Sequence, residues 1–382
     1  MLRAFFAGTS IRPRNWDYLN DPKPLYENHK NVVYTMNGAD SFSYYFPGSL
    51  SKISLDQGNY TIEKNFKRGV EILSNDITDL LNEDPSGEIE VEIAGHSRGG
   101  VAATRVAEKV RNNFKNNENV KINLITLDPV PGPMHFKDNV KMELSEGKSS
   151  RSVVVYTMDD KKVFYTPQEI KNADVVIILP GDHESVYGKR DHSLKGDTDD
   201  VYHYYYNGES CSLSQLLNLE NGIYIADDNY NVKKITNENL KKSVEEIYEK
   251  CSDSTRQKVL MNSIIEKSKF SLDDILEANS KYKEKFEKKL KLVERMPLLK
   301  LSFEAALDMF RGNSIFKVLL NREGVYEPIF QAKHELFDAK TPDPQKACLI
   351  LKDAKQGKGV YASKLLEAVE KKISDRYALE KA

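Results

Sequence analysis

Three residues with the side chains needed for nucleophilic catalysis each follow an apolar run along this chain: Ser97, Asp128 and His183. A serine hydroxyl is a weak nucleophile until a base accepts its proton, and a neutral imidazole within hydrogen-bond reach is a suitable base. A carboxylate behind the imidazole holds its tautomer and stabilises the imidazolium that forms. These residue types predict acyl transfer through an activated serine, if the fold brings them together.

Ser97 stands at the apex of a predicted strand–turn–helix unit, residues 88–109, EIEVEIAGHSRGGVAATRVAEK. Alternating apolar residues come before the turn, and apolar residues at helical spacing follow it. A nucleophile elbow needs this context, and its tight turn needs residues without a Cβ, here Gly95 and Gly99. The backbone N–H of Arg98, at the positive end of the helix, is an expected oxyanion donor. The alternative interpretation is a glycine-rich β-to-α turn with an ordinary serine.

The acid and the second oxyanion donor have alternatives. Asp128 follows the apolar run 120–127, directly after the elbow unit, and we favour it; Asp159 and Asp160 follow the next run, 151–158. The second oxyanion N–H is expected from Thr9, in the turn after the apolar run 2–7; a plain strand-ending turn is the other interpretation.

The base is expected to be His183, because of the seven histidines it alone comes immediately after a strong apolar run, 173–179. His96 is next to the nucleophile and is expected to face away from it. Asp182 is too close to His183 in sequence to orient its ring. A histidine in a surface loop is the alternative interpretation, and three other loop histidines stay open as the base: His135, His192 and His203.

The elements that must position these residues read as a parallel α/β sheet. Strands are predicted at 2–7, 31–36, 89–93, 120–127, 151–158 and 173–179, and helices at 61–82, after Ser97 to about 113, and at 166–172. Several strands are continuously apolar, which is typical of a parallel sheet with helices on both faces. Ligands bind at the carboxyl ends of such strands, and all the candidate acids and the base follow those ends.

The sequence changes character near residue 236. We expect a catalytic domain at 1–235 and an all-α domain at 236–382, with helices at 239–251, 256–267, 272–295, 301–311 and 346–371. The locally basic stretch 281–295 is either a solvated helix face or a patch for a membrane surface or an acidic partner. The aromatic segment 39–60 is either a packed loop or a lid over an acyl chain.

Composition narrows the class of protein. The chain has 382 residues and a net charge of −2, so we expect no nucleic-acid partner. No apolar run approaches the roughly 18 residues that span a membrane. The apolar core of the first ten residues is shorter than that of a secretory signal peptide, so we expect none. Three scattered cysteines predict a reducing compartment, with neither a disulfide framework nor a metal site, and the expected chemistry needs no cofactor.

Several segments resemble known hydrolases. GHSRGG with its flanks resembles the elbow of lipase-type α/β hydrolases, ITLDPVPGP resembles their aspartate segment, and GDHESVYG their histidine segment. The order Ser97, Asp128, His183 is also theirs. A closer likeness is to the bacterial hydrolase family that contains type VI secretion phospholipase effectors, at FFAGT, GHSRGG and 181–188. Two positions depart from that family: Ala7 replaces its aspartate, and 184–187 lack its glycines.

The resemblance, which covers about the first half of the chain, implies an α/β-hydrolase-like fold and a serine hydrolase acting on an acyl ester of a lipid or phospholipid. A thioesterase, a deacylase or a peptidase on the same triad remains an alternative, as does a non-catalytic effector whose helical domain binds a protein partner. The expected location is the cytoplasm, or a host or rival cell reached through a specialised secretion system.

Overall fold

The computed structural model describes most of the chain: residues 2–8, 44–46, 55–131, 142–143, 150–159, 166–183, 185–187, 189–191, 201–211, 214–268, 270–298, 300–312 and 314–377. Five predicted features lie wholly or mainly outside these ranges. They are Thr9, Asp160, the strand at 31–36, the loop histidines His135 and His192, and most of the aromatic segment 39–60.

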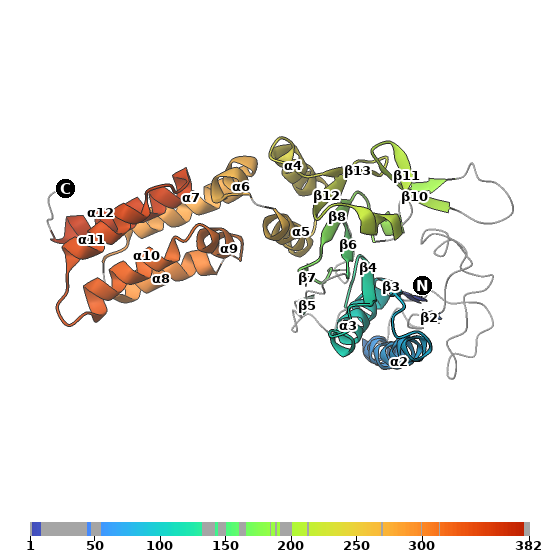
Figure 1. Cartoon of the computed structure of the whole chain (residues 1–382). Helices are drawn as coiled ribbons and strands as arrows, with labels where there is room; N and C mark the ends of the chain where they lie inside the picture. The colour runs from blue at the N-terminus through green and yellow to red at the C-terminus, as the bar shows by residue number, and fades with distance from the viewer. Residues whose placement is uncertain are drawn as a thin grey trace. The chain divides into compact units, whose positions relative to one another are not determined.

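An eleven-stranded mixed sheet organises the described residues of the first part of the chain (Figure 1). Its strands are β1 (Leu2–Phe6), β2 (Tyr44–Phe46), β3 (Ile89–His96), β4 (Val120–Leu127), β6 (Ser152–Thr157), β8 (Val175–Leu179), β9 (Lys189–Asp191), β10 (Val201–Tyr206), β11 (Glu209–Cys211), β12 (Gly222–Ala226) and β13 (Asn231–Lys234). A separate two-stranded sheet joins β5 (Met142–Glu143) to β7 (Ile170–Lys171).

The order β12-β8-β6-β4-β3-β1-β2 is parallel throughout, and antiparallel pairs occur only around β12–β13 and β9–β10–β11 among the described strands. Every residue of β6 and β8 is buried, which explains their unbroken Val and Ile runs. The carboxyl ends of β3, β4 and β8 therefore meet at one edge of the sheet, as predicted.

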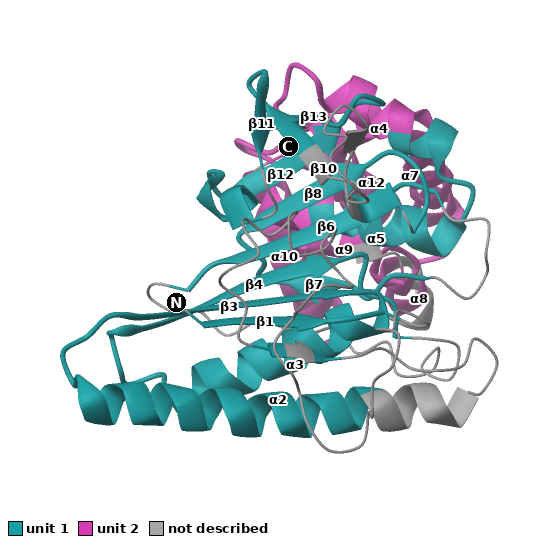
Figure 2. Cartoon of the chain, turned by 90° about the vertical axis from the view of Figure 1, so that its right-hand side faces the viewer, with its two compact units in different colours: residues 1–235, 247–263 teal, residues 236–246, 264–382 magenta. Residues whose placement is uncertain are grey.

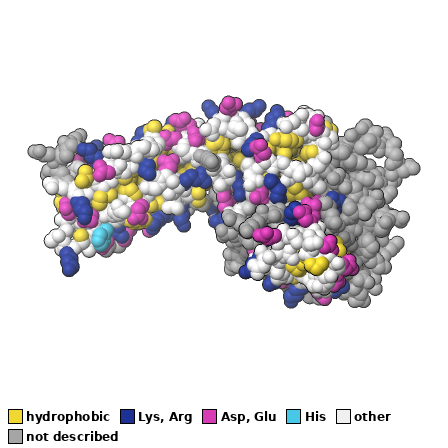
Figure 3. Space-filling model, in the orientation of Figure 1, with side chains coloured by type: hydrophobic (Ala, Val, Ile, Leu, Met, Phe, Trp, Pro, Cys, Tyr) yellow, Lys and Arg dark blue, Asp and Glu magenta, His cyan; other side chains and the backbone are white. Residues whose placement is uncertain are grey.

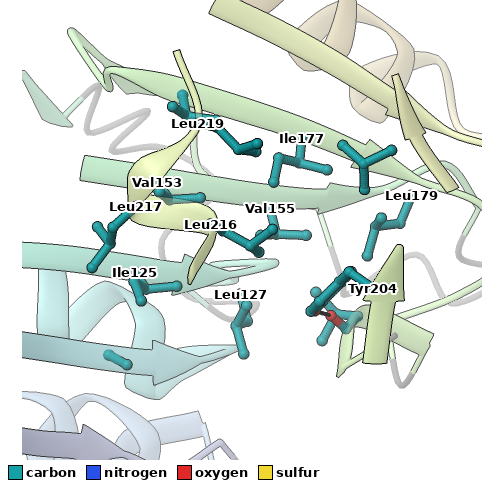
Figure 4. Packing of buried hydrophobic residues seen from close by; sticks show 14 of the residues in the cluster. Ile125, Leu127, Val153, Val155, Ile177, Leu179, Tyr204, Leu216, Leu217 and Leu219 are labelled. Carbon is teal, nitrogen blue, oxygen red and sulfur yellow. Dashed lines mark hydrogen bonds between the residues drawn. The ribbon is translucent and has the colours of Figure 1, made fainter. Parts of the chain in front are cut away.

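Both faces of the sheet are packed. Helices α2 (Leu55–Glu83) and α3 (Arg98–Asn113) lie together beside β1 (Figure 2), and a Cβ at Gly69 of α2 would lie 2.7 Å from Phe6. On the opposite face, the short 3₁₀ helices η3 (Ser185–Tyr187) and η4 (Ser214–Asn218) form part of the cover. Figure 4 shows Leu216 and Leu217 of η4 over Val153, Val155 and Ile125.

One local prediction for this part was wrong, and one strand inside the sheet was missed. Residues 166–169 are irregular instead of helical, because the backbone bonds elsewhere: Gln168 N–H donates to the Pro129 carbonyl at 2.7 Å, and Tyr156 Oη bridges the Gln168 carbonyl and the Ile170 N–H. The strand β12, which pairs with β8 inside the sheet, was not predicted, since GIYIA is short and its neighbours are polar.

The rest of the chain is helical, as predicted, although two of the expected helices are each split in two and the helices within 314–338 were not predicted. The helices are α4 (Leu240–Lys250), α5 (Ser254–Lys267), α6 (Leu272–Ala278), α7 (Ser280–Arg295), α8 (Lys300–Arg311), α9 (Ser314–Arg322), α10 (Tyr326–Lys333), the π-helix η5 (His334–Asp338), α11 (Pro344–Ala354) and α12 (Val360–Tyr377). The predicted helix 272–295 is split at Asn279, whose side chain caps α7. The predicted helix 346–371 is split near Gly357, which has a φ of +75°.

The chain divides into two compact units, which Figure 2 distinguishes by colour: 1–235 with 247–263, and 236–246 with 264–382. We expected a single cut after residue 235, but most of α5 groups with the sheet. On the helical unit, positive and negative side chains are interspersed over the face in Figure 3. No helix within the described ranges is long and apolar enough to cross a membrane.

Candidate active site

Ser97 occupies the single position between the end of β3 and the start of α3. Its backbone has φ 58° and ψ −126°, a conformation that costs a residue with a side chain on the order of 1–3 kcal/mol. The surrounding backbone imposes it: Ser97 N–H donates to the Leu127 carbonyl at 2.9 Å, and the Ser97 carbonyl accepts from Val130 N–H at 3.2 Å. Serine at a helix N-cap usually accepts a hydrogen bond from that helix, but the Ser97 hydroxyl accepts none.

The two elbow glycines have no room for a side chain. A Cβ at Gly99 would lie 2.0 Å from the Phe6 carbonyl oxygen, and a Cβ at Gly95 would lie 2.4 Å from the Gly99 carbonyl oxygen. Both contacts are with backbone, which cannot rotate away. The absence of side chains at these positions is what lets α3 approach β1 and β3 closely enough to hold Ser97.

Asp128 and His183 form a buried hydrogen-bonded pair. Asp128 follows β4, His183 follows β8, and His183 Nδ1 lies 2.5 Å from Asp128 Oδ2. Asp128 is completely buried and His183 is 6% exposed. Because an ionised carboxylate can only accept, Nδ1 carries a proton, and Nε2 is then the nitrogen that can accept one from another group.

The alternative acids are placed differently. Asp159 accepts a hydrogen bond from Ser252 Oγ at 2.8 Å at a partly exposed position, and Asp160 lies outside the described residues. Asp182 closes the turn after β8 by accepting from the backbone N–H and the hydroxyl of Ser185. The carboxylate that the fold pairs with His183 is thus that of Asp128.

His96, the last residue of β3, lies against His183. The two ring centroids are 4.6 Å apart, and His96 Nε2 donates to the His183 carbonyl oxygen at 3.2 Å. Burial, followed by repulsion from His183, lowers the pKa of His96 to about 3, so its ring is neutral at physiological pH. The expectation that His96 does not serve Ser97 directly agrees with this geometry, but its contact with His183 was not foreseen.

Arg256 of α5 contacts Asp128 directly, and it is the main residue of the site that sequence reasoning missed. It is completely buried, and its Nη1 and Nη2 donate to Asp128 Oδ1 at 2.7 Å and Oδ2 at 3.1 Å. Nη1 also lies 2.9 Å from both the carbonyl and the hydroxyl oxygen of Thr157. A signal existed: Arg256 precedes the buried Val259 and Leu260 by three and four residues, which puts a charge on the apolar face of α5.

These contacts determine the ionisation of Asp128. Burial alone would raise the pKa of its carboxyl, but the charge of Arg256 and the hydrogen bond from His183 outweigh burial and hold the pKa far below its usual value. Asp128 is therefore an anion at all physiological pH values. Its negative charge is stabilised by the permanently charged guanidinium of Arg256 and by the imidazole of His183.

The structure describes one of the two expected oxyanion donors. Arg98 is the first residue of α3, at the positive end of that helix. Thr9 is outside the described residues, but its neighbour Gly8 is against the elbow: a Cβ there would lie 3.0 Å from Ser97 Cβ. In the described part of the chain, no group of three or more His, Cys, Asp or Glu could hold a metal ion.

No protein-family model matches the chain, and a search of curated proteins finds no match.

Proposed function

We propose that this protein is a serine hydrolase of α/β-hydrolase-like fold that cleaves an acyl ester through Ser97, His183 and Asp128. The observation that carries the proposal is the buried Asp128–His183 hydrogen bond at the same sheet edge as Ser97, whose strained backbone keeps its hydroxyl out of the helix cap. A strained serine on a β-to-α turn is the geometry of a nucleophile elbow. The mostly parallel sheet supports the fold assignment.

In the first step, Ser97 Oγ attacks the carbonyl carbon of the acyl group while His183 Nε2 accepts the hydroxyl proton. Asp128 stabilises the imidazolium, and His183 then gives the proton to the leaving alcohol. The tetrahedral oxyanion accepts hydrogen bonds from the backbone N–H of Arg98 and from a second N–H in the loop after β1, which we assign to Thr9. The positive end of α3 favours the same charge.

In the second step, His183 removes a proton from water, the hydroxide attacks the acyl-enzyme, and Ser97 leaves with that proton. No metal ion or organic cofactor takes part in this sequence. The substrate class follows from the resemblance of the elbow, aspartate and histidine segments to lipase-type hydrolases, which favours a lipid or phospholipid ester. A thioester, an acylated protein or a peptide is compatible with the same chemistry.

The test is labelling with a fluorophosphonate probe, which reacts with activated serines, together with turnover of p-nitrophenyl esters. Ser97→Ala and His183→Ala are each expected to abolish labelling and to lower kcat by about 10⁴–10⁶-fold. Ser86→Ala, in an exposed turn before β3, is the matched control and keeps both activities.

If the folded wild-type protein were not labelled, with or without liposomes, the hydrolase proposal would be rejected in favour of a non-catalytic effector. Labelling that persists in Ser97→Ala would place the reactive serine elsewhere. Labelling confined to Ser97 would justify a screen of phospholipids, thioesters and acylated peptides as substrates.

A further inference from the structure

The guanidinium of Arg256 is built into the proposed triad from a part of the chain far away in sequence. Arg256 lies on α5, in the segment 247–263 that groups with the sheet unit, 128 residues after Asp128. Both residues have no exposed side-chain surface. A fully buried arginine is rare unless it is paired, and here its partner is the triad carboxylate.

We propose that Arg256 is a positioning residue that balances the charge of Asp128 and thereby sets the pH range in which His183 acts as a base, an inference that rests on the proposed function of Ser97. Each oxygen of Asp128 has two donors. Oδ1 accepts from Arg256 Nη1 and from Thr157 N–H at 3.3 Å, and Oδ2 accepts from Arg256 Nη2 and His183 Nδ1. The fork of Arg256 thus fixes the carboxylate plane that orients the imidazole.

The charge argument follows from these contacts. With His183 neutral, Arg256 and Asp128 sum to zero charge; with His183 protonated, the three groups sum to +1. Without Arg256, the corresponding sums are −1 and zero. A buried site disfavours net charge, so loss of Arg256 makes protonation of His183 more favourable. Arg256 therefore keeps His183 available as a base at lower pH.

Other groups near His183 do not supply this balance. Among the described residues, titratable or charged side chains surround the turn that holds His183. The sheet contributes His96 on β3, Asp128 after β4, Asp159 after β6, Tyr204 on β10 and Tyr230 before β13, and Asp182 precedes His183 in the chain. The α4–α5 region contributes Cys251 and Arg256. His96 is neutral at physiological pH, and Asp182 and Asp159 are acidic side chains, which cannot supply a positive charge. Arg256 is the cation in this set.

The side-chain chemistry explains why arginine occupies the position. A guanidinium presents several donors in one plane, so it can bridge the two oxygens of Asp128 and the two of Thr157 at once. A lysine ammonium carries the same charge on one nitrogen and cannot reproduce the fork. Charge balance and orientation can therefore be separated by substitution.

The first test needs no substrate. The ring signals of the seven histidines in the full chain are followed by NMR against pH, and His183 is assigned with His183→Gln. In Arg256→Gln, His183 is expected to titrate at least about one pH unit higher than in the parent. In Arg256→Lys, which keeps the charge, its midpoint stays close to that of the parent.

The matched control is Arg111→Gln. Arg111 is another buried arginine of the same unit, but its guanidinium donates to the carbonyls of Ile122 and Arg151. This substitution leaves the His183 midpoint unchanged. An equal shift in both variants, or no shift in a folded Arg256→Gln protein, would overturn the inference.

The second test uses ester hydrolysis. In Arg256→Gln the acid limb of kcat/KM moves to higher pH together with the NMR midpoint, so activity falls most at low pH. A merely structural role would lower kcat/KM by the same factor at every pH. If the parent hydrolyses no ester, the proposed function fails, but the NMR result still decides the role of Arg256.

A second pair of variants tests the same inference if Arg256→Gln does not fold. The double variant Asp128→Asn, Arg256→Gln removes both buried charges and is compared with Asp128→Asn. His183 is expected to titrate at higher pH in the double variant, because the single variant retains an unbalanced cation nearby. Equal midpoints would contradict the inference.

Discussion

The imidazole rings of His96 and His183 lie against each other with centroids 4.6 Å apart, and His96 Nε2 donates to the His183 carbonyl oxygen at 3.2 Å. A carbonyl can only accept, so this bond places the proton of neutral His96 on Nε2. His96 thereby fixes both the backbone and one face of the proposed base. His96, the residue before the proposed nucleophile Ser97, thus supports the proposed base His183 by donating to its carbonyl oxygen.

The burial of His96, reinforced by repulsion from His183, predicts a pH dependence of stability. The folded-state pKa of His96 is about 3, against 6.5 for an unperturbed histidine, so between these values the unfolded chain binds a proton that the folded chain does not. The free energy of unfolding therefore keeps its full contribution from neutral His96 above pH 6.5. It decreases as the pH falls toward 3, by at most about 1.4 kcal/mol per pH unit. Urea unfolding of His96→Asn should have a shallower pH dependence across this window than the parent.

The control for this experiment is His334→Asn, a substitution at an exposed histidine in the helical unit. It should leave the slope of the parent unchanged. If the slope of His96→Asn matches that of the parent, His96 is not the group that is kept neutral by folding.

Asp128 and Asp159 provide a matched pair of acid substitutions. Asp128→Asn leaves a neutral side chain behind His183 and should lower kcat by about 10⁴-fold, whereas Asp159→Asn should change it less than about twofold. Asp128→Asn also leaves buried Arg256 without its anion, which destabilises the fold by about 3–5 kcal/mol. Steady-state kinetics at a temperature where both variants are folded makes the comparison; equal losses would reject Asp128 as the acid.

Gly99→Ala is expected to disrupt the elbow. The new Cβ would meet the Phe6 carbonyl oxygen at 2.0 Å, so β1, β3 and α3 must separate, and we expect a loss of several kcal/mol or insoluble protein. Gly208→Ala is the control, since nothing lies within 4 Å of its Cβ and only its φ of +82° is unfavourable, at about 1 kcal/mol. Thermal unfolding compares the two; a Gly99→Ala protein as stable as the control would contradict the close approach.

The break between α6 and α7 depends on a single cap. Asn279 Oδ1 accepts a hydrogen bond from Tyr282 N–H at 3.1 Å, and the side chain is buried. Asn279→Ala should therefore destabilise the helical unit by about 1 kcal/mol. Asn321→Ala, at an exposed position of α9, should change stability by less than about 0.5 kcal/mol in the same denaturation experiment.

The sequence alone predicted the elements whose patterns are local. The apolar runs of β4, β6 and β8 identified a buried parallel sheet, because strands covered on both faces need no polar alternation. It also predicted which residues follow the strand ends, and so the candidates Ser97, Asp128 and His183. Glycine spacing around Ser97 predicted a tight turn, and the structure explains it by backbone contacts at Gly95 and Gly99.

Tertiary structure decided what local patterns cannot contain. Strand β12 exists because β8 offers it a partner, and 166–169 are not helical because Pro129 and Tyr156 bond their backbone. The choice of Asp128 over Asp159 depends on which carboxylate reaches His183, and Asp128 does so past the intervening strand β6. Arg256 was missed for the same reason: its segment shows only a charge on the apolar face of α5, and the folded chain alone pairs that charge with Asp128, 128 residues away.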